Sequence, residues 1–475
     1  MDDVAFWPAS RQAAAIRAGE LSSRDLLETY LDRVGKHNPT INAVVTLAAD
    51  EARAAADAAD AAVSRGESVG PLHGLPVTIK DALETAGIRS TGGAVELAEH
   101  VPSSDAAAVA RVRAAGAIVF GKTNLPRWSG DGQSYNELFG ITNNPWDLSR
   151  SPGGSSGGAA AAVAAGLTSF ELGTDIGGSV RMPSHFCGIW GHKPSFGLVP
   201  GFGYLDSVNG GLVEADNNVI GPMARSVDDL DLLLDVMAGP VGEAAKAWSV
   251  SLPPPRHEQL SDYRVAVWLD DPLCPVDSEM RQLIERAVDS LAAAGAKVDR
   301  SARPDVDFAE ASRLGMRLIS VATSVGLPVD KIEELAEASR GSAALVQRHH
   351  TWLERHRRRT QIRAAWAEFF TSFDVLLCPV TITPAFEHQI EGTWATRRLE
   401  VDGESRPYGD LMPWSALIGM AYLPVTTPPL GRTAQGLPVS VQVVGPYLED
   451  RTAIDLARRL AEAAGAGYVA PNAFR

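Results

Sequence analysis

The residues best suited to chemistry lie in two glycine- and serine-rich segments, 151–166 and 172–195. Two glycines stand directly before Ser179, and glycine lets backbone N–H groups crowd around one point. Amide hydrogens that converge on a single oxygen form an oxyanion hole, which stabilises the charge that develops when a nucleophile attacks a carbonyl group. The pattern therefore indicates acyl transfer by a serine. A phosphate-binding loop is disfavoured because no GxxxxGK[ST] pattern occurs.

A serine hydroxyl is a weak nucleophile at neutral pH and needs a base. No histidine is well placed for this role, because His73, His185 and His192 are isolated and follow no recognisable Ser/His/Asp order. The GxSxG pattern of nucleophile elbows does not surround Ser179 either. The sequence therefore does not indicate a histidine base.

Lys80 is the remaining candidate for the base. It ends an apolar run, residues 75–79, that would bury its amine. Burial lowers the pKa of a lysine because the charged form loses its hydration. Asp81 is adjacent, and its carboxylate would keep the lysine charged unless it points elsewhere. We expect a neutral lysine base, with the direction of the Asp81 side chain as the open question.

The elements that must position these residues alternate between strands and helices. Residues 76–79 and 117–120 are apolar or β-branched runs of strand length, and residues 105–115 between them have helical character. This alternation is typical of an α/β sheet covered by helices. Further buried strands are expected at 375–379 and 439–444.

The α/β pattern continues on both sides of a Pro/Gly-rich break at residues 239–256, so we expect a single domain over residues 1–475. Its expected parts are an N-terminal helical region at 1–70 and a catalytic core at 71–240. A helical insertion is expected at about 305–345, near the substrate entrance.

Composition and charge exclude several classes of function. With 43 lysines and arginines against 58 aspartates and glutamates, the formal net charge is −15. An acidic surface opposes a general role on nucleic acid or an anionic membrane. Three cysteines without CxxC spacing indicate neither a disulfide framework nor a zinc site. No basic-then-apolar leader and no apolar run of about 18 residues occur. We expect a cytoplasmic protein, a monomer or homodimer, without metal or cofactor.

Several other residues in and near the glycine-rich segments have simple structural interpretations. Thr174 and Asp175 are expected to hold the loop through side-chain-to-backbone hydrogen bonds. Arg181 is expected to pair with a buried carboxylate or carbonyl. Cys187 lies between apolar residues and is expected to be a packed thiol. The basic run at 355–359 is expected to form a solvated face or intramolecular ion pairs.

Eight distinctive segments follow one another over nearly the whole chain. They are GLPVTIKD (74–81), GKTN (121–124), FGITNNPW (139–146), PGGSSGG (152–158), GTDIGGSVRMP (173–183), GHKPSFGLVP (191–200), GPMARSVDDL (221–230) and LPVSVQVVGP (437–446). Ser155 and Ser179 lie 24 residues apart. In their sequence, their order and this spacing, the segments resemble the amidase signature (AS) enzymes. The resemblance implies an α/β fold with a central twisted mixed β-sheet covered on both sides by α-helices.

Carried over to these positions, the resemblance implies a catalytic triad and an oxyanion hole. Lys80 is then the base, Ser155 the relay in a cis peptide, and Ser179 the nucleophile that accepts the acyl group. The implied oxyanion hole consists of the backbone amides of Ile176, Gly177, Gly178 and Ser179.

This arrangement implies an amidase that hydrolyses carbon–nitrogen bonds of small, non-peptide amides through an acyl-enzyme. In the family the segment corresponding to 125–136 lines the acyl side, so Trp128 and Ser129 are expected to contact substrate. Phe202 and Tyr204 are candidate aromatic walls. Aromatic walls favour bulky or aryl substrates. We therefore expect aryl acylamides, with ester or carbamate (urethane) side activity.

An alternative function is that of the glutaminase component of a tRNA-dependent amidotransferase, which works in a complex and channels ammonia. That component usually has a Ser-Leu-Asp-Gln-type segment after the GHKPS motif, where this chain reads GFGYLDSVNGG (201–211). A catalytically silent binding protein is disfavoured because all three catalytic positions are filled.

Overall fold

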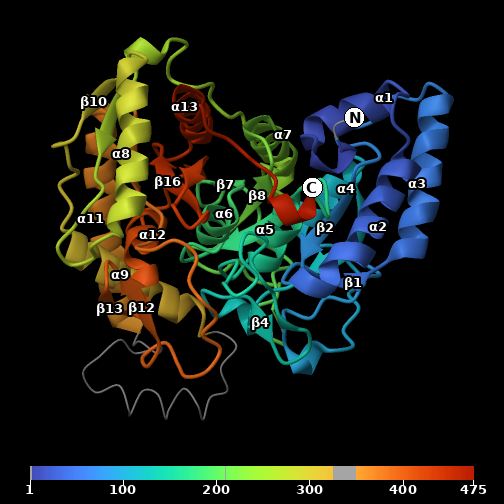
Figure 1. Cartoon of the computed structure of the whole chain (residues 1–475), viewed down its shortest axis with the longest axis horizontal. Coiled ribbons are helices and arrows are strands. Elements are labelled where there is room, and N and C mark those ends of the chain that lie inside the picture. The colour runs from blue at the N-terminus through green and yellow to red at the C-terminus, as the bar shows by residue number, and fades with distance from the viewer. Residues whose placement is uncertain (1–2, 209, 325–348) are drawn as a thin grey trace.

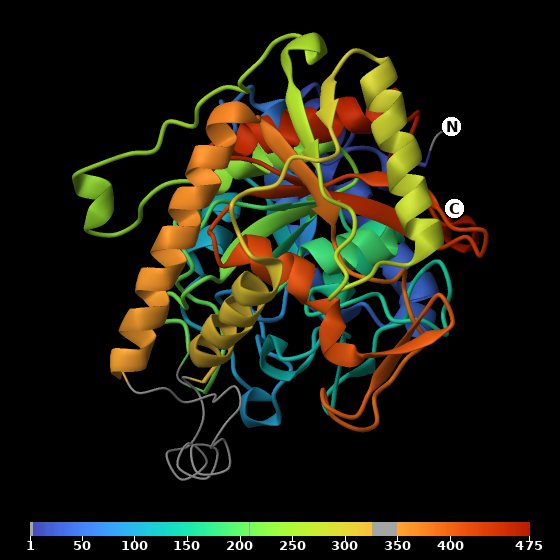
Figure 2. The same cartoon turned by 90° about the vertical axis from the view of Figure 1, so that its left-hand side faces the viewer.

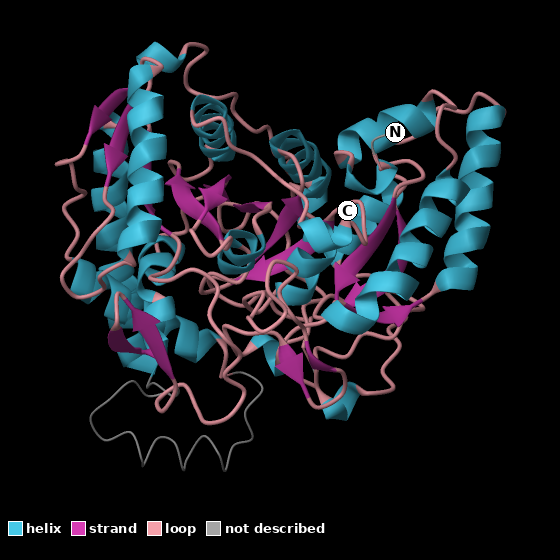
Figure 3. Ribbon diagram, viewed as in Figure 1, coloured by secondary structure: helices cyan, strands magenta, loops and turns pink. Residues whose placement is uncertain are grey.

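The computed structural model describes residues 3–208, 210–324 and 349–475. Helices and strands alternate along the chain, as predicted (Figure 3). The helices are α1 (Ala9–Arg17), α2 (Ser23–Ile41), α3 (Ala49–Ser64), α4 (Ala107–Ala114), α5 (Gly157–Ala164), α6 (Arg181–Cys187), α7 (Val227–Met237), α8 (Ser278–Ala293), α9 (Phe308–Ala322), α11 (His349–Ser372), α12 (Pro413–Gly419) and α13 (Asp450–Ala463).

The strands form one large sheet and three small ones within the described ranges. They are β1 (Val44–Leu47), β2 (Pro76–Lys80), β3 (Ile118–Thr123), β4 (Tyr135–Asn136), β5 (Gly140–Ile141), β6 (Glu171–Asp175), β7 (Trp190–Lys193), β8 (Val219–Ala224), β9 (Arg264–Val267), β10 (Lys297–Asp299), β11 (Val375–Pro379), β12 (Arg398–Val401), β13 (Glu404–Pro407), β14 (Val425–Thr427), β15 (Pro429–Arg432) and β16 (Pro438–Val444).

The large sheet is mixed. Among the described residues its strand order is β10-β9-β11-β16-β14-β7-β8-β6, with β15 paired to β16. Strand β9 runs parallel to both of its neighbours. The remaining pairs are antiparallel. The predicted mixed sheet is therefore confirmed.

Helices cover both faces of this sheet (Figure 1). Helices α7 and α13 lie on one side of the central strands, and α5 and α6 lie on the other. Helices α8 and α11 stand at the left in Figure 1, and Figure 2 shows strands running between them. Helices α1 to α3 lie at the opposite end, where α3 packs on β3 and α2 on β2.

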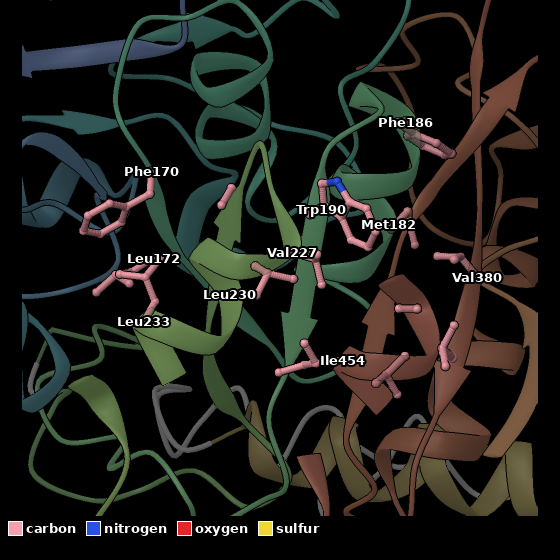
Figure 4. Packing of buried hydrophobic residues seen from close by; sticks show 14 of the residues in the cluster. Phe170, Leu172, Met182, Phe186, Trp190, Val227, Leu230, Leu233, Val380 and Ile454 are labelled. Carbon is pink, nitrogen blue, oxygen red and sulfur yellow. The ribbon is translucent and has the colours of Figure 1, made fainter. Parts of the chain in front are cut away.

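The core explains why the central strands form where apolar runs occur. All seven residues of β16 and all five of β11 are buried, and near-continuous apolar runs are typical of strands covered on both faces. Figure 4 shows Leu172 of β6 and Leu230 and Leu233 of α7 in one packed region, with Trp190 of β7 and Met182 of α6 beside them.

The strand that carries Lys80 belongs to a separate small sheet. Strands β2 and β3 pair in parallel, and β1 adds to β3 in the antiparallel direction. The two strands predicted at 76–79 and 117–120 therefore form, but they pair with each other rather than within the large sheet. Strand β2 nevertheless packs against β6, which brings the two sheets together at Lys80.

The expected helical insertion is only partly within the described residues. Helix α9 (Phe308–Ala322) occupies its first part, and residues 325–345 of the prediction lie outside the described ranges. None of the described helices is both long enough and apolar enough to cross a membrane.

Candidate active site

Lys80 is the last residue of β2, and its side chain has no exposed surface. The Lys80 Nζ atom lies within hydrogen-bond distance of three hydroxyl oxygens. These are Oγ of Ser155 at 2.7 Å, Oγ of Ser156 at 3.0 Å and Oγ1 of Thr174 at 2.7 Å. The three hydroxyls come from the loop before α5 and from β6, so packing of β2 against β6 creates the cluster.

Burial lowers the pKa of Lys80 from 10.5 to about 7. The charges of Asp175 and Glu171 act in the opposite direction and favour the ammonium form. All three direct partners of Nζ are neutral hydroxyls, so no partner in contact with it carries the negative charge that would hold the proton. Near neutral pH a large share of the molecules therefore has a free amine.

The Asp81 side chain points away from Lys80, which answers the question left open by the sequence. Its Oδ2 accepts hydrogen bonds from the backbone amide and from the hydroxyl of Thr91. The charges that act on Lys80 are those of Asp175 and Glu171, not that of Asp81. Burial raises the pKa of Asp81, and the charge of Lys122 on β3 opposes that shift.

Ser155 lies in the loop that leads into α5, and the peptide bond between Gly154 and Ser155 is cis, as the resemblance implied. Gly154 allows residues 131–133 to approach closely, because an added Cβ would lie 2.5 Å from the carbonyl oxygen of Asp131. Ser134 stabilises the loop: its hydroxyl donates to the carbonyl oxygen of Gly153 at 3.0 Å and accepts from a backbone amide of α5.

The two serines that contact Lys80 have different hydrogen-bond partners. The Ser156 hydroxyl donates to the carbonyl oxygen of Thr174 at 3.3 Å and accepts from the Thr174 amide at 3.2 Å. Its proton is thus already used. Among the described residues, the Ser155 hydroxyl forms one hydrogen bond, to Lys80. The Ser155 proton is therefore available for transfer.

Ser179 lies in the turn between β6 and α6, and it is partly exposed, whereas Lys80 and Ser155 are fully buried. The Ser156 amide donates to the carbonyl oxygen of Ser179 at 3.3 Å, which joins this turn to the loop of Ser155. We call residues 176–179 the oxyanion loop. The structure thus brings the three predicted catalytic positions into one region, with Ser179 at its accessible side.

The oxyanion loop is held by a buried ion pair between Asp175 and Arg181, neither of which is exposed. Burial would raise the pKa of Asp175, but the charge and hydrogen bonds of Arg181 outweigh it and hold that pKa well below its ordinary value. Arg181 also donates to the carbonyl oxygen of Ser415 and to Oε1 of Gln442. The predicted pairing of Arg181 is confirmed.

One of the predicted oxyanion donors is already engaged. The Gly178 amide donates to Oδ1 of Asp175 at 2.9 Å, because the carboxylate sits beneath the turn that it stabilises. In this structure Gly178 is therefore not a free donor, contrary to the sequence prediction. The amides of Ile176, Gly177 and Ser179 have no hydrogen-bond acceptor among the described residues.

The predicted substrate-contacting residues differ in their placement. Trp128 and Ser129 adopt left-handed φ values of 51° and 55°, and the Trp128 ring packs on Gly92, where an added Cβ would lie 3.1 Å from it. Ser129 Oγ is buried, and hydrogen bonding to the Ser129 and Thr174 side chains opposes the rise that burial causes in the pKa of Tyr204. Tyr204 is buried and pairs with Leu83, three positions after Lys80.

Phe202 does not join this group. Its side chain is 40% exposed, and its carbonyl oxygen accepts the Ala107 amide at the start of α4. The described residues give no contact between the Phe202 side chain and the candidate site, and its role as an aromatic wall stays a prediction.

Three residues near the oxyanion loop were not singled out from the sequence. An added Cβ at Gly177 would lie 2.2 Å from Cε of Met412 and 3.6 Å from Cδ1 of Ile319, so both side chains cover this glycine. Asn217 donates from Nδ2 to the Ile176 carbonyl oxygen at 3.1 Å. Ile319 lies on α9, within the expected insertion, but no motif signals Met412 or Asn217.

Other candidate groups are engaged elsewhere. Ring nitrogens of His73, His185 and His192 contact groups outside the oxyanion loop. Cys187 is buried and contacts the carbonyl oxygen of Pro152, and burial raises the pKa of its thiol. It is a packed thiol, as expected. No group of three or more His, Cys, Asp or Glu side chains that could hold a metal ion occurs in the described ranges.

The basic run also behaves as expected at two positions. Arg358 pairs with Glu310, and Arg359 pairs with Asp216. These are ion pairs within the chain, so the two residues do not form a free basic surface.

The chain is similar to known proteins in both sequence and fold. Residues 25–454 match the family model described as Amidase. A glutamyl-tRNA(Gln) amidotransferase component from Cyanothece sp. is 32% identical over 463 aligned positions, which cover 91% of this chain and 92% of the relative. A bacterial aryl acylamidase of the AS enzyme family superposes with a TM-score of 0.79 at 25% identity, covering 96% of each chain. A 6-aminohexanoate cyclic dimer hydrolase superposes with a TM-score of 0.80 at 26% identity over 100% of each chain.

Proposed function

The chain belongs to the amidase signature family, whose hydrolases act on carbon–nitrogen bonds. From that premise we propose that Lys80, Ser155 and Ser179 form its catalytic triad. In this proposal Ser179 attacks the amide carbonyl, Ser155 relays the proton and Lys80 is the base.

One observation carries the proposal: a fully buried amine whose direct partners are three hydroxyls. A neutral amine has two hydrogens and one lone pair, so with three hydroxyl neighbours one of them must donate to the lone pair. The Ser156 proton is committed to a carbonyl oxygen. The Thr174 side chain is also hydrogen-bonded to the Tyr204 side chain. Ser155 is the donor that fits the relay, because its hydroxyl contacts Lys80 and its loop is joined to the turn of Ser179.

The proposed reaction follows from this arrangement. Lys80 takes the Ser155 proton while Ser155 takes the Ser179 proton, and the Ser179 oxygen bonds to the carbonyl carbon. Free amides of Ile176, Gly177 and Ser179 stabilise the resulting oxyanion. The relay then returns a proton to the nitrogen as the carbon–nitrogen bond breaks. Water attacks the acyl-enzyme by the same route and releases the acid.

The walls near the proposed triad support an uncharged and bulky substrate. Met412 and Ile319 cover Gly177, and Trp128 lies over Gly92, whose amide donates to the carbonyl oxygen of Asp81 next to Lys80. Apolar and aromatic walls with a few polar groups are typical of sites for organic ligands. The buried Ser129 hydroxyl supplies one such polar group. We propose aryl acylamides as substrates, with activated esters and carbamates as side substrates because they share the reacting carbonyl group.

The second candidate function is that of the glutaminase component of an amidotransferase. It is favoured by the 32% identical relative, which covers nearly the whole chain. Free glutamine carries an ammonium and a carboxylate, and a site for it needs charged partners. Two buried arginines near the oxyanion loop, Arg181 and Arg359, are already paired with carboxylates. The apolar walls therefore favour the first candidate.

The two candidate functions can be distinguished by assaying the purified chain alone. We expect kcat/KM to be highest for an aryl anilide, lower for an aliphatic amide and lowest for glutamine. A preference for glutamine, or activity only with added partner proteins, would support the second candidate instead. Ser179→Ala, tested on the same panel, must lose activity. If it retained activity, the proposed triad would be rejected.

A further inference from the structure

Asn217 connects the oxyanion loop to the segment that leads into β8. It is 1% exposed, it has a left-handed φ of 69°, and its Nδ2 donates to the Ile176 carbonyl oxygen at 3.1 Å. Asparagine is one of the few residues other than glycine that adopt this backbone conformation readily. The segment before β8 therefore presents an amide side chain to the peptide bond at the start of the oxyanion loop.

The geometry of that peptide bond gives the contact a chemical meaning. In a trans peptide the carbonyl oxygen and the N–H of the next residue point in opposite directions within one plane. The hydrogen bond from Asn217 to the Ile176 oxygen therefore sets the direction of the Gly177 N–H, which has no acceptor among the described residues. Hydrogen bonding at the carbonyl also polarises the same amide and makes its N–H a better donor.

The neighbouring residue anchors Asn217. Asp216 forms an ion pair with Arg359 of α11 at 2.8 Å, and it accepts a hydrogen bond from the hydroxyl of Tyr422. The Arg359 side chain is 1% exposed, and its guanidinium lies 4.6 Å from the centre of the Tyr422 ring. The position of Asn217 is thus determined by contacts with α11 and with the loop that follows α12.

We propose that Asn217 is a positioning residue that orients the Gly177 amide as an oxyanion donor. The proposal rests on the proposed function, because it requires Ser179 to form a tetrahedral adduct beside this loop. It adds a residue from outside the glycine-rich segments to the machinery that stabilises the transition state.

The test uses Asn217→Gly, because glycine tolerates the left-handed φ and only the side chain is lost. Asn42→Gly is the matched control: Asn42 has a φ of 54°, and its Nδ2 likewise donates to loop carbonyl oxygens, those of Phe139 and Ile141. We expect Asn217→Gly to lower kcat by roughly tenfold to a hundredfold, less than the loss of a donor itself, with little change in KM. Asn42→Gly should leave both unchanged.

An inhibitor distinguishes positioning from general damage. An aryl trifluoromethyl ketone forms an oxyanion adduct with the serine, so its affinity should fall by the same factor as kcat/KM. The affinity for an unreactive substrate analogue should be retained. Unchanged kcat in Asn217→Gly, or equal losses for the adduct-forming and the unreactive ligand, would overturn the proposal. Retained activity in Ser179→Ala would instead overturn the proposed function, so the two failures are distinguishable.

Discussion

The protonation of Lys80 should control the rate below neutral pH. Burial lowers its pKa from 10.5 to about 7. At pH 7.5 an ordinary lysine is neutral in about one molecule in a thousand, whereas a lysine with the lowered pKa is neutral in about three quarters of them. Only the neutral amine accepts a proton. The rate should therefore be constant above about pH 8 and fall about tenfold per pH unit well below the pKa.

The assay is kcat/KM for an aryl anilide between about pH 5 and about pH 9. Lys80→Arg should be inactive at every pH, because a guanidinium stays charged. Lys193→Met is the matched control. Lys193 is also buried with a pKa lowered to about 7, but its amine donates to the carbonyl oxygens of Pro194 and Leu423. In this variant kcat/KM should still fall at the same acidic pH as in the unmodified protein.

Temperature identifies the group that titrates. Burial also raises the pKa of Glu171 to about 7. Titration of a carboxylic acid is therefore a competing explanation for the fall of kcat/KM at acidic pH. Ionisation of an ammonium group is strongly endothermic, and that of a carboxylic acid is nearly thermoneutral. The midpoint should therefore fall as the temperature rises. A flat profile through pH 6, a midpoint independent of temperature, or an active Lys80→Arg variant would refute the reasoning.

Three further predictions concern neighbouring residues. Ser155→Ala should lower kcat by about 10²–10⁴-fold through loss of the relay, and near-normal steady-state kinetics would contradict this. Asp175→Asn leaves the buried charge of Arg181 without its ion-pair partner, so the free energy of unfolding in urea should fall by about 3–5 kcal/mol; a change within error would argue against the pair as an anchor. Gly154→Ala should cost about 1–3 kcal/mol, because its Cβ would meet backbone atoms, including a carbonyl oxygen at 2.5 Å. Gly177→Ala should cost less, because its Cβ meets the flexible end of a methionine, and equal losses of thermal stability would contradict the contrast.

The predictions from sequence succeeded where they depended on local pattern. The apolar run before Lys80 predicted its burial, because a strand inside a sheet buries consecutive side chains. The direction of Asp81 required knowledge of Thr91, which lies in a loop without periodicity. The pairing of β2 with β3 in a separate sheet was also beyond local pattern, because strand partners are chosen by contacts across the whole molecule.

The oxyanion loop shows a second limit of sequence reasoning. The expectation that Asp175 holds the loop through side-chain-to-backbone hydrogen bonds is confirmed, because its carboxylate accepts from the Gly178 and Val180 amides. The sequence did not indicate that one of these amides would be Gly178, a predicted oxyanion donor. A carboxylate can stabilise the turn or face elsewhere, and only the packed position of Arg181 decides between these. No sequence motif indicated a role for Asn217, because its hydrogen bond joins residues that are 41 positions apart in the chain.

The origin of the side chains over Gly177 has a consequence for how this enzyme could diversify. Lys80 and its three hydroxyl partners come from a continuous early stretch of the chain, whereas Ile319 and Met412 reach the same loop from segments encoded far downstream. Substitutions that change substrate selectivity can therefore arise without substitutions in the residues that transfer protons. A mutagenesis library confined to α9 and to residues 412–419 would change the side chains over Gly177 and leave the hydrogen bonds of Lys80 unaltered.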